Sequence, residues 1–462
     1  MSTDNISVIC LEESSLQDNS QEKGKKADQY VLIKVFGMSF GIISFCILFA
    51  SFWAIIPRTD SIIYQSYWIE AVLPTTSIYV LYAASDLLNL STWTEEKSLF
   101  SPSIFLKMFF MYMIPNIFFY ISSYVTWSVY LEYNHPMPNL GLIIWPIFIT
   151  FTIGLWFILP STLLSQTEFR RKLKIYMLYK FWVQIVGILM EIFKHLFANP
   201  PLGLQFLVPF MVAGFRELDT YLRTKLITKM MGIKNESATS LNSIHVSSLY
   251  TVFIAIRIVG TKFTTILCSI AVDFFLHLKT AYKIVKESIR VEAERIWNET
   301  PQNERIKTLV IGELIEGFTP IIYAICMMMA YYGPNANILS NVGNTYWSEK
   351  IEDIGLHFIT MAILFAVDTL NAAISSFYLW NTAKISMLRE VYQILGEFWH
   401  FIAIKLAFYM TTFFASNDIN LGLDGTHSFQ WISQEGWISL VNDSIAITDD
   451  EKASLVEKIS SI

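Results

Sequence analysis

Long apolar runs separated by short polar segments dominate this chain. A helix needs roughly 20 apolar residues to cross a bilayer, and many runs come near that length. They lie at 31–56, 66–89, 104–131, 140–164, 176–197, 202–222, 308–332, 353–380 and 392–414. One more run, 246–278, is interrupted by Arg257, Gly260 and Lys262, so it is either a broken or re-entrant helix or a single crossing. The sequence predicts an all-α, polytopic integral membrane protein with about nine or ten transmembrane helices.

Polar segments at both ends divide the chain into three parts. Residues 1–29 are rich in Ser, Asp and Glu, which predicts a disordered tail, and the run that follows is long enough to stay as a span rather than be cleaved. Residues 30–415 form the predicted transmembrane helical domain. Residues 416–462 are polar and acidic, and the segment TDDE at 448–451 is typical of a capping box that opens a short terminal helix.

The distribution of Lys and Arg among the loops predicts the orientation, because cytoplasmic loops carry an excess of both. Basic residues gather before the first run and in 165–175, 216–234, 279–307 and 384–389, whereas 132–139 and 198–201 carry none. This pattern places the N-terminus in the cytoplasm and the C-terminal tail on the opposite side. Because 216–234 and 279–307 are both predicted inside, the chain between them has to cross an even number of times. That requirement favours a hairpin in 246–278 or an error in a neighbouring run such as 202–222.

Composition narrows the class of protein further. Charged residues make up 16% of the chain, against a usual value of about 25%, while 53% of residues are hydrophobic. No basic patch with interleaved aromatic residues is present, so nucleic-acid binding is not expected. The cysteines form no disulfide framework and no CxxC pattern, and no nucleotide-binding or histidine-rich motif occurs. We therefore expect neither a metal nor a cofactor, and the lipid bilayer is the one partner that composition predicts.

The run 308–332 carries two carboxylates, Glu313 and Glu316, near its start. A carboxylate inside hydrocarbon costs at least a few kcal/mol, so such residues usually face a water-filled path, a partner charge or a ligand. Their i,i+3 spacing places both on one face of a helix. Two carboxylates that close repel each other unless a proton or a cation lies between them. The neighbouring Gly312, Gly317 and Pro320 are predicted to loosen the helix and free backbone carbonyls as further ligands.

Structural explanations of the pair remain open beside the functional one. Arg257 or Lys262 can supply a salt bridge. Lys307 at the start of the run can also place both glutamates only about one or two turns below the headgroups. Because the preceding segment is the most basic in the chain, we expect the pair on the cytoplasmic side, as a gate or coupling site rather than a midplane binding site.

Other ionisable or polar residues within the runs are further candidates for ion or solute coupling. Asp368 and Asn371 share a helical face, and Glu397-x-x-His400 has the spacing that directs two ligands the same way. Asp86 and similar residues near the ends of runs are expected to reach the interface. The coupling candidates besides the glutamate pair are Glu70, Arg257, Lys262, Asp273, Asp368, Asn371, Glu397 and His400.

Three classes of function fit these features. A secondary transporter or ion-conducting protein, coupled to a proton or a monovalent cation and moving a small solute, accounts best for the buried ionisable groups. A multi-pass sensory or signalling receptor is the first alternative, favoured by short outside loops and sizeable basic inside segments. A membrane-embedded enzyme acting on lipid is the second, with Glu397, His400 and the glutamate pair as its only chemistry.

Overall fold

The computed structural model describes residues 30–51, 67–125, 153–198, 207–226, 236–252, 263–294, 301–332 and 354–422. Within these ranges the chain is helical throughout apart from short turns, with no strand, which confirms the predicted all-α class. Residues 1–29, residues 423–462 with the capping box at 448–451, and Arg257 and Lys262 lie outside the described residues, whereas 416–422, predicted to belong to the polar tail, continue the last helix.

The helices follow the apolar runs but are longer than several of them. The first, Tyr30–Ser51, opens the described chain. The others are α2 (Tyr67–Thr94), α3 (Pro102–Val125), α5 (Ser161–Leu164), α6 (Thr167–Ala198), α7 (Leu207–Lys225), α8 (Glu236–Tyr250), α10 (Phe263–Glu294), α11 (Pro301–Tyr332), α14 (Ile354–Ala383) and α15 (Met387–Gly422), with the short 3-10 helix η1 (Lys97–Leu99) after α2.

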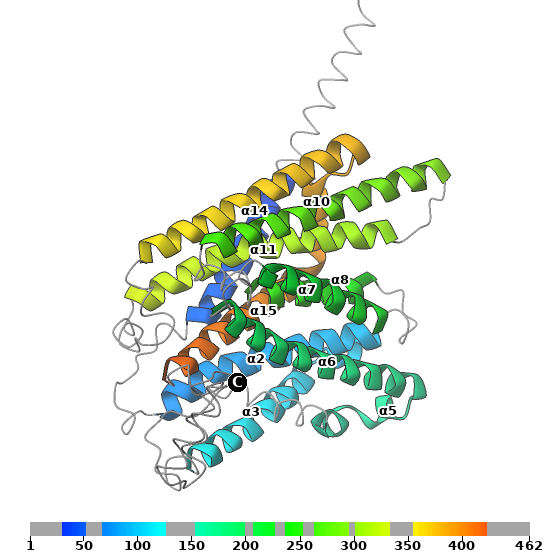
Figure 1. The fold of residues 1–462 in the computed structure, drawn as a ribbon. Coiled ribbons are helices and arrows are strands. Elements are labelled where there is room, and N and C mark those ends of the chain that lie inside the picture. The colour runs from blue at the N-terminus through cyan, green and yellow to red at the C-terminus, as the bar shows by residue number, and fades with distance from the viewer. Residues whose placement is uncertain are drawn as a thin grey trace, which may run out of the picture.

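The helices form three groups in space (Figure 1). Helices α10, α11 and α14 lie side by side and contact one another. Helices α2, α3 and α6 form a second group, in which α2 contacts both of the others. Helices α7, α8 and α15 lie between the two groups, and α11 contacts α8 and α15. The helix with the predicted glutamate pair, α11, is therefore at the centre of one side of the bundle.

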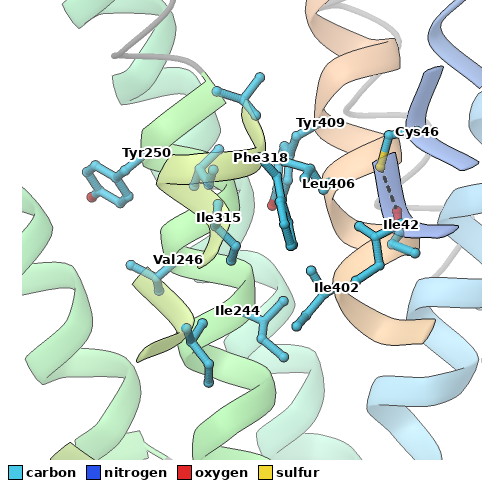
Figure 2. Close-up of a cluster of buried hydrophobic side chains, with 14 of the residues drawn as sticks. Ile42, Cys46, Ile244, Val246, Tyr250, Ile315, Phe318, Ile402, Leu406 and Tyr409 are labelled. Atoms are coloured by element: carbon cyan, nitrogen blue, oxygen red, sulfur yellow. Dashed lines mark hydrogen bonds between the residues drawn. The ribbon is translucent and has the colours of Figure 1, made fainter. Parts of the chain in front are cut away.

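Apolar side chains from three other helices pack α11 into the bundle. Figure 2 shows Ile42 of the first helix, Ile244 of α8, Ile315 of α11 and Ile402 of α15 in one buried cluster. Packing of this kind excludes water from the interior, so any polar group there needs a partner within the protein. A second apolar cluster joins α2, α3 and α6.

The uncertain run 246–278 is divided between two separate helices. Helix α8 ends at Tyr250 and α10 begins at Phe263. The excess of Lys and Arg predicts the basic segment 279–307 to be a cytoplasmic loop. Helix α10 nevertheless continues to Glu294, through most of this segment. It does so because Lys and Glu are good helix formers and because the segment is amphipathic: Ala281 and Ile284 are buried, whereas Lys283 is exposed.

Among the described residues, three helices are long and apolar enough to cross a membrane, namely Tyr30–Ser51, Arg305–Met329 and Met361–Ala383. Only 11% of the first span and 17% of the third are buried within the protein, against 67% of the second. The first and third therefore present apolar side chains such as Phe36 and Phe377 outward, where lipid would cover them. These features indicate a membrane protein. The count of nine or ten spans stays a prediction.

Candidate functional site

The predicted glutamate pair meets a histidine from the neighbouring helix. His277 of α10 lies between the two carboxylates of α11, with its Nδ1 2.8 Å from Glu313 Oε1 and its Nε2 3.1 Å from Glu316 Oε2. The three side chains are each at most 10% exposed. We call His277, Glu313 and Glu316 the carboxylate–imidazole cluster. The i,i+3 spacing places both carboxylates on one face of α11, as the sequence predicted, and the structure directs that face toward α10.

Arg216 of α7 adds a permanent positive charge to this cluster. Its Nη1 and Nη2 each donate to Glu316 Oε1 at 3.3 Å. The guanidinium is partly exposed, with 28% of the side chain accessible, so it connects the buried carboxylate to the edge of the protein. Glu316 therefore has partners on two other helices, α7 and α10. A change in its charge alters how both helices are attracted to α11.

The geometry fixes how many protons the cluster holds. Both ring nitrogens of His277 face a carboxylate oxygen at hydrogen-bonding distance, and each such bond needs one proton. Two protons are satisfied either by an imidazolium between two carboxylates or by a neutral imidazole with one protonated carboxyl. With Arg216, both arrangements are neutral overall. Loss of one proton leaves two acceptors facing each other and one uncompensated negative charge in a buried position, which is unfavourable.

Helix α11 is not interrupted beside the cluster, contrary to the predicted loosening. It is continuous from Pro301 to Tyr332, with Pro320 inside it. Continuous packing against α8, α10, α14 and α15 outweighs the helix-breaking tendency of the glycines and the proline. Proline nevertheless has no amide hydrogen, so the carbonyl of Glu316, four residues earlier, receives no donor from it. One backbone acceptor beside the cluster is thereby free of its usual helical partner.

A second buried network joins α2 and α6. Lys180 Nζ lies 2.6 Å from Asp86 Oδ1, and neither side chain is more than 6% exposed. Tyr112 of α3 donates to Asp86 Oδ2 at 2.6 Å, and Tyr176 donates to Oδ1 at 3.3 Å. Lys180 also donates to the hydroxyl of Tyr82 at 3.1 Å. The carboxylate is therefore fully partnered, as a buried charge has to be.

This arrangement corrects the expectation for Asp86. Its place near the end of an apolar run predicted a side chain reaching the interface, yet only 1% of Asp86 is exposed. The reason is that α6 presents a polar residue every fourth position, Lys172, Tyr176, Lys180 and Gln184, along one stripe that faces α2. The carboxylate of Asp86 is therefore paired with Lys180 in the interior and is not solvated at the membrane surface.

A third set of polar residues connects α6 to α7. Asp219 Oδ1 accepts from Arg223 Nε and from Trp182 Nε1, both at 2.7 Å. Arg223 Nη1 donates to the hydroxyl of Tyr179 at 3.4 Å. Both members of the Asp219–Arg223 pair are fully buried. This i,i+4 pair lies beyond the clean apolar part of run 202–222 and was not among the predicted candidates.

The remaining candidates whose side chains the structure describes lie elsewhere in the protein and do not contact the cluster. Glu397 is 57% exposed and its nearest cation is Lys307 at 4.0 Å. His400 is also exposed, so the E-x-x-H motif lies on the outer surface of α15. Asn371 is buried on α14, where Asp368 is half-buried. Glu70 and Asp273 lie on α2 and α10, but their side chains are outside the described set.

Sequence reasoning missed His277, Arg216, Lys180 and the Asp219–Arg223 pair as site residues. For Lys180 a signal exists, namely the polar stripe on α6. For His277 and Arg216 none exists, because both meet α11 only through the packing of helices distant in sequence. Within the described residues, no group of three or more His, Cys, Asp or Glu side chains is arranged to hold a metal ion.

Comparison of the chain with known protein families, curated proteins and solved structures finds no match. Function is therefore argued from the side-chain geometry alone.

Proposed function

We propose that this chain is a multi-pass membrane transporter or ion-conducting protein that couples movement of a small solute to a proton through the carboxylate–imidazole cluster. One observation carries the proposal: the ring of His277 lies between Glu313 and Glu316 with both nitrogens at hydrogen-bonding distance. Buried ionisable groups arranged to share protons are the usual device of proton-coupled carriers.

The geometry favours a proton over a monovalent cation as the coupling ion. A bound cation needs several oxygen ligands around an open position, whereas here the imidazole ring fills the space between the two carboxylates. An imidazole also changes charge near neutral pH, in the range where a cellular proton gradient acts. Proton binding and release at His277 is the simplest event that this arrangement supports.

Protonation of the carboxylate–imidazole cluster can change how the helices around it pack. The cluster joins three helices, with Arg216 on α7, His277 on α10 and the glutamates on α11. Loss of the proton removes one attraction between α10 and α11 and leaves an excess negative charge beside Arg216. A shift of charge at a contact between helices biases the equilibrium between two packings, which is what alternating access requires.

Contacts between predicted cytoplasmic ends support the proposed orientation. Lys307, at the start of the apolar part of α11, lies 4.0 Å from Glu397 in the first part of α15. Burial raises the pKa of Glu390 at the start of α15, and the charge of Lys307 opposes this effect. Lys34 of the first helix interacts with Tyr392, also of α15. Three helix ends that the basic-residue rule assigns to the cytoplasm therefore lie together.

Epitope tags at about residues 236, 296 and 340 test this orientation and the span count. We expect the tags at 236 and 296 to be accessible from the cytoplasm and the tag at 340 from the other side. Accessibility is measured by antibody binding before and after the plasma membrane is permeabilised. Opposite locations for 236 and 296 would mean a single crossing in 246–278 and would contradict the nine-span form of the proposal.

Reconstitution into liposomes tests the proposed activity. The full chain is incorporated into vesicles that contain a pH-sensitive dye, and gradients of candidate solutes are imposed one at a time. Acidification or alkalinisation that needs both the protein and a solute gradient supports coupled transport, and acidification under a membrane potential alone supports proton conduction. Protein-free vesicles are the control. If no gradient or potential moves protons through folded protein, the proposal fails.

Alanine substitution of Gly317 tests whether α11 bends during transport or moves as a rigid body. A Cβ at Gly317 would meet no atom within 4 Å, so Gly317→Ala is sterically free in this conformation. Alanine is the better helix former by about 1 kcal/mol, so the melting temperature is expected to rise. If transport requires α11 to bend near Pro320, flux falls in the same variant. Gly37→Ala, also unobstructed but on the first helix, is the matched control. Unchanged flux in Gly317→Ala would show that α11 moves as a rigid body.

A further inference from the structure

Lys405 is a buried cation for which the described part of the chain provides no counterion. It lies on α15 and is only 3% exposed. Among the described residues its amine forms neither an ion pair nor a hydrogen bond, and its one close contact is with the ring of Phe401, 5.6 Å from the centroid. A cation–π contact at that distance replaces only a small part of the hydration that burial removes.

A second unpartnered donor belongs to the same region. Arg223 is fully buried and uses Nε and Nη1 for Asp219 and Tyr179, but its Nη2 has no hydrogen-bond partner among the described atoms. Lys405 lies close enough to Lys180, Asp86 and Arg223 for their charges to act on it.

The formal charges of this region do not balance. With Lys405 protonated, Lys180, Arg223 and Lys405 contribute three positive charges, and Asp86 and Asp219 contribute two negative ones, which leaves an excess of one positive charge. Each carboxylate has its own cation, at 2.6 Å and 2.7 Å, and Asp219 Oδ2 has no hydrogen-bond partner among the described atoms. An uncompensated charge in a water-excluded interior is costly, so a site with this composition favours binding one negative charge.

Aromatic and hydroxyl-bearing side chains surround the two donors. Tyr179 contacts Arg223, and the rings of Tyr179 and His245 lie 6.1 Å apart. The hydroxyl of Tyr409, one turn after Lys405 on α15, is 3.0 Å from His245 Nε2. Aromatic walls with a few converging polar groups are typical of small-molecule sites.

We propose that a small monovalent anion binds between Lys405 of α15 and Arg223 of α7, where Tyr179 of α6 and His245 of α8 also lie. One negative charge neutralises the excess, whereas a divalent anion would reverse it. Binding of the anion does not depend on the proposed transport function. The statement that this anion is the transported solute does rest on that function. Together with one proton released by the carboxylate–imidazole cluster, a monovalent anion would cross the membrane without net movement of charge.

Binding is tested on the purified full chain in detergent, which needs no transport. Chloride represents inorganic monovalent anions, pyruvate represents carboxylates, and sulfate is the divalent comparison. Melting temperature and tryptophan fluorescence are the readouts, because a ligand of the folded state stabilises it and Trp182 is hydrogen-bonded to Asp219. We expect a saturable response to chloride or pyruvate and a weaker one to sulfate. The monovalent probe that saturates at lower concentration identifies the class of anion.

Substitution of Lys405 tests the position of the site. Lys405→Met removes an unpaired buried charge with little change in shape, so the anion-free protein is expected to melt about 2–5 °C higher. Anion affinity is expected to fall about tenfold or more. Lys405→Arg keeps the charge and should keep binding if Lys405→Met fails to fold. Lys174→Met, at an exposed lysine on α6, should change neither property.

Each outcome bears on one proposal. No saturable response to either monovalent anion in the wild type, or an unchanged affinity in Lys405→Met, would overturn the anion site. Anion binding without any proton-coupled flux would leave the site standing and overturn the proposed transport function. Flux driven by an uncharged or cationic solute, with no anion response, would overturn the anion site and leave the proposed transport function standing.

Discussion

Replacement of Asp86 by asparagine is expected to lower the free energy of unfolding by about 3–5 kcal/mol, the usual cost of breaking a buried ion pair. The substitution leaves the ammonium of Lys180 buried, with 6% of its side chain exposed, and removes the carboxylate that compensates its charge, while the hydrogen bond to the hydroxyl of Tyr82 remains. It also removes the negative charge that Tyr112 and Tyr176 stabilise. Thermal unfolding of the purified protein in detergent, followed by circular dichroism, measures the effect.

The double variant Asp86→Leu/Lys180→Met is the control for this prediction. It removes both charges and fills the space with apolar side chains, so most of the lost stability should return. We also expect it to keep proton flux, because the pair is buried between α2 and α6 and does not touch the carboxylate–imidazole cluster. A single variant as stable as the wild type would show that Lys180 has another counterion.

Replacement of Glu316 by glutamine is expected to reduce proton-coupled flux to the level of protein-free vesicles. The amide cannot take up a proton in place of the carboxylate, and it lowers the attraction to both His277 and Arg216. Glu313→Gln removes only one of the charges beside His277. It weakens proton binding without separating α7 from α11, so the pH at which flux is half-maximal should move to a lower value.

Stability and a surface control distinguish this effect from misfolding. Because Arg216 is 28% exposed, it remains partly hydrated after Glu316→Gln, and the loss of stability should be about 1–3 kcal/mol, less than at Asp86. Glu397→Gln removes a carboxylate that is 57% exposed and lies beside Lys307 rather than His277, and flux should be unchanged. Loss of flux in Glu397→Gln as well would indicate that α15, not the cluster, carries the proton.

Hydrophobic patterning predicted the helices because it depends only on local sequence. The all-α class and the helical state of 308–332 and 353–380 follow from runs of apolar residues. The continuation of α10 through the basic segment was missed for a physical reason. Charged residues that end a membrane span need not end a helix, since Lys, Arg and Glu favour helical backbone.

The site was predicted only in the part that lies on one helix. Glu313 and Glu316 are three residues apart, so their shared face follows from helix geometry. Their partner His277 is 36 residues before Glu313, and Arg216 is 100 residues before Glu316. Such pairings depend on which helices pack together, and hydropathy does not encode that choice. Asp86 was misjudged for the same reason, since its partner Lys180 is 94 residues away.

The most direct test of the central claim compares proton flux through the wild type and the Glu313→Gln/Glu316→Gln double variant. Both are reconstituted in vesicles with a pH-sensitive dye, at equal amounts of protein shown to be folded by thermal unfolding. Coupling through the carboxylate–imidazole cluster predicts solute-dependent proton flux in the wild type and none above background in the double variant. Equal flux in the two proteins would contradict it.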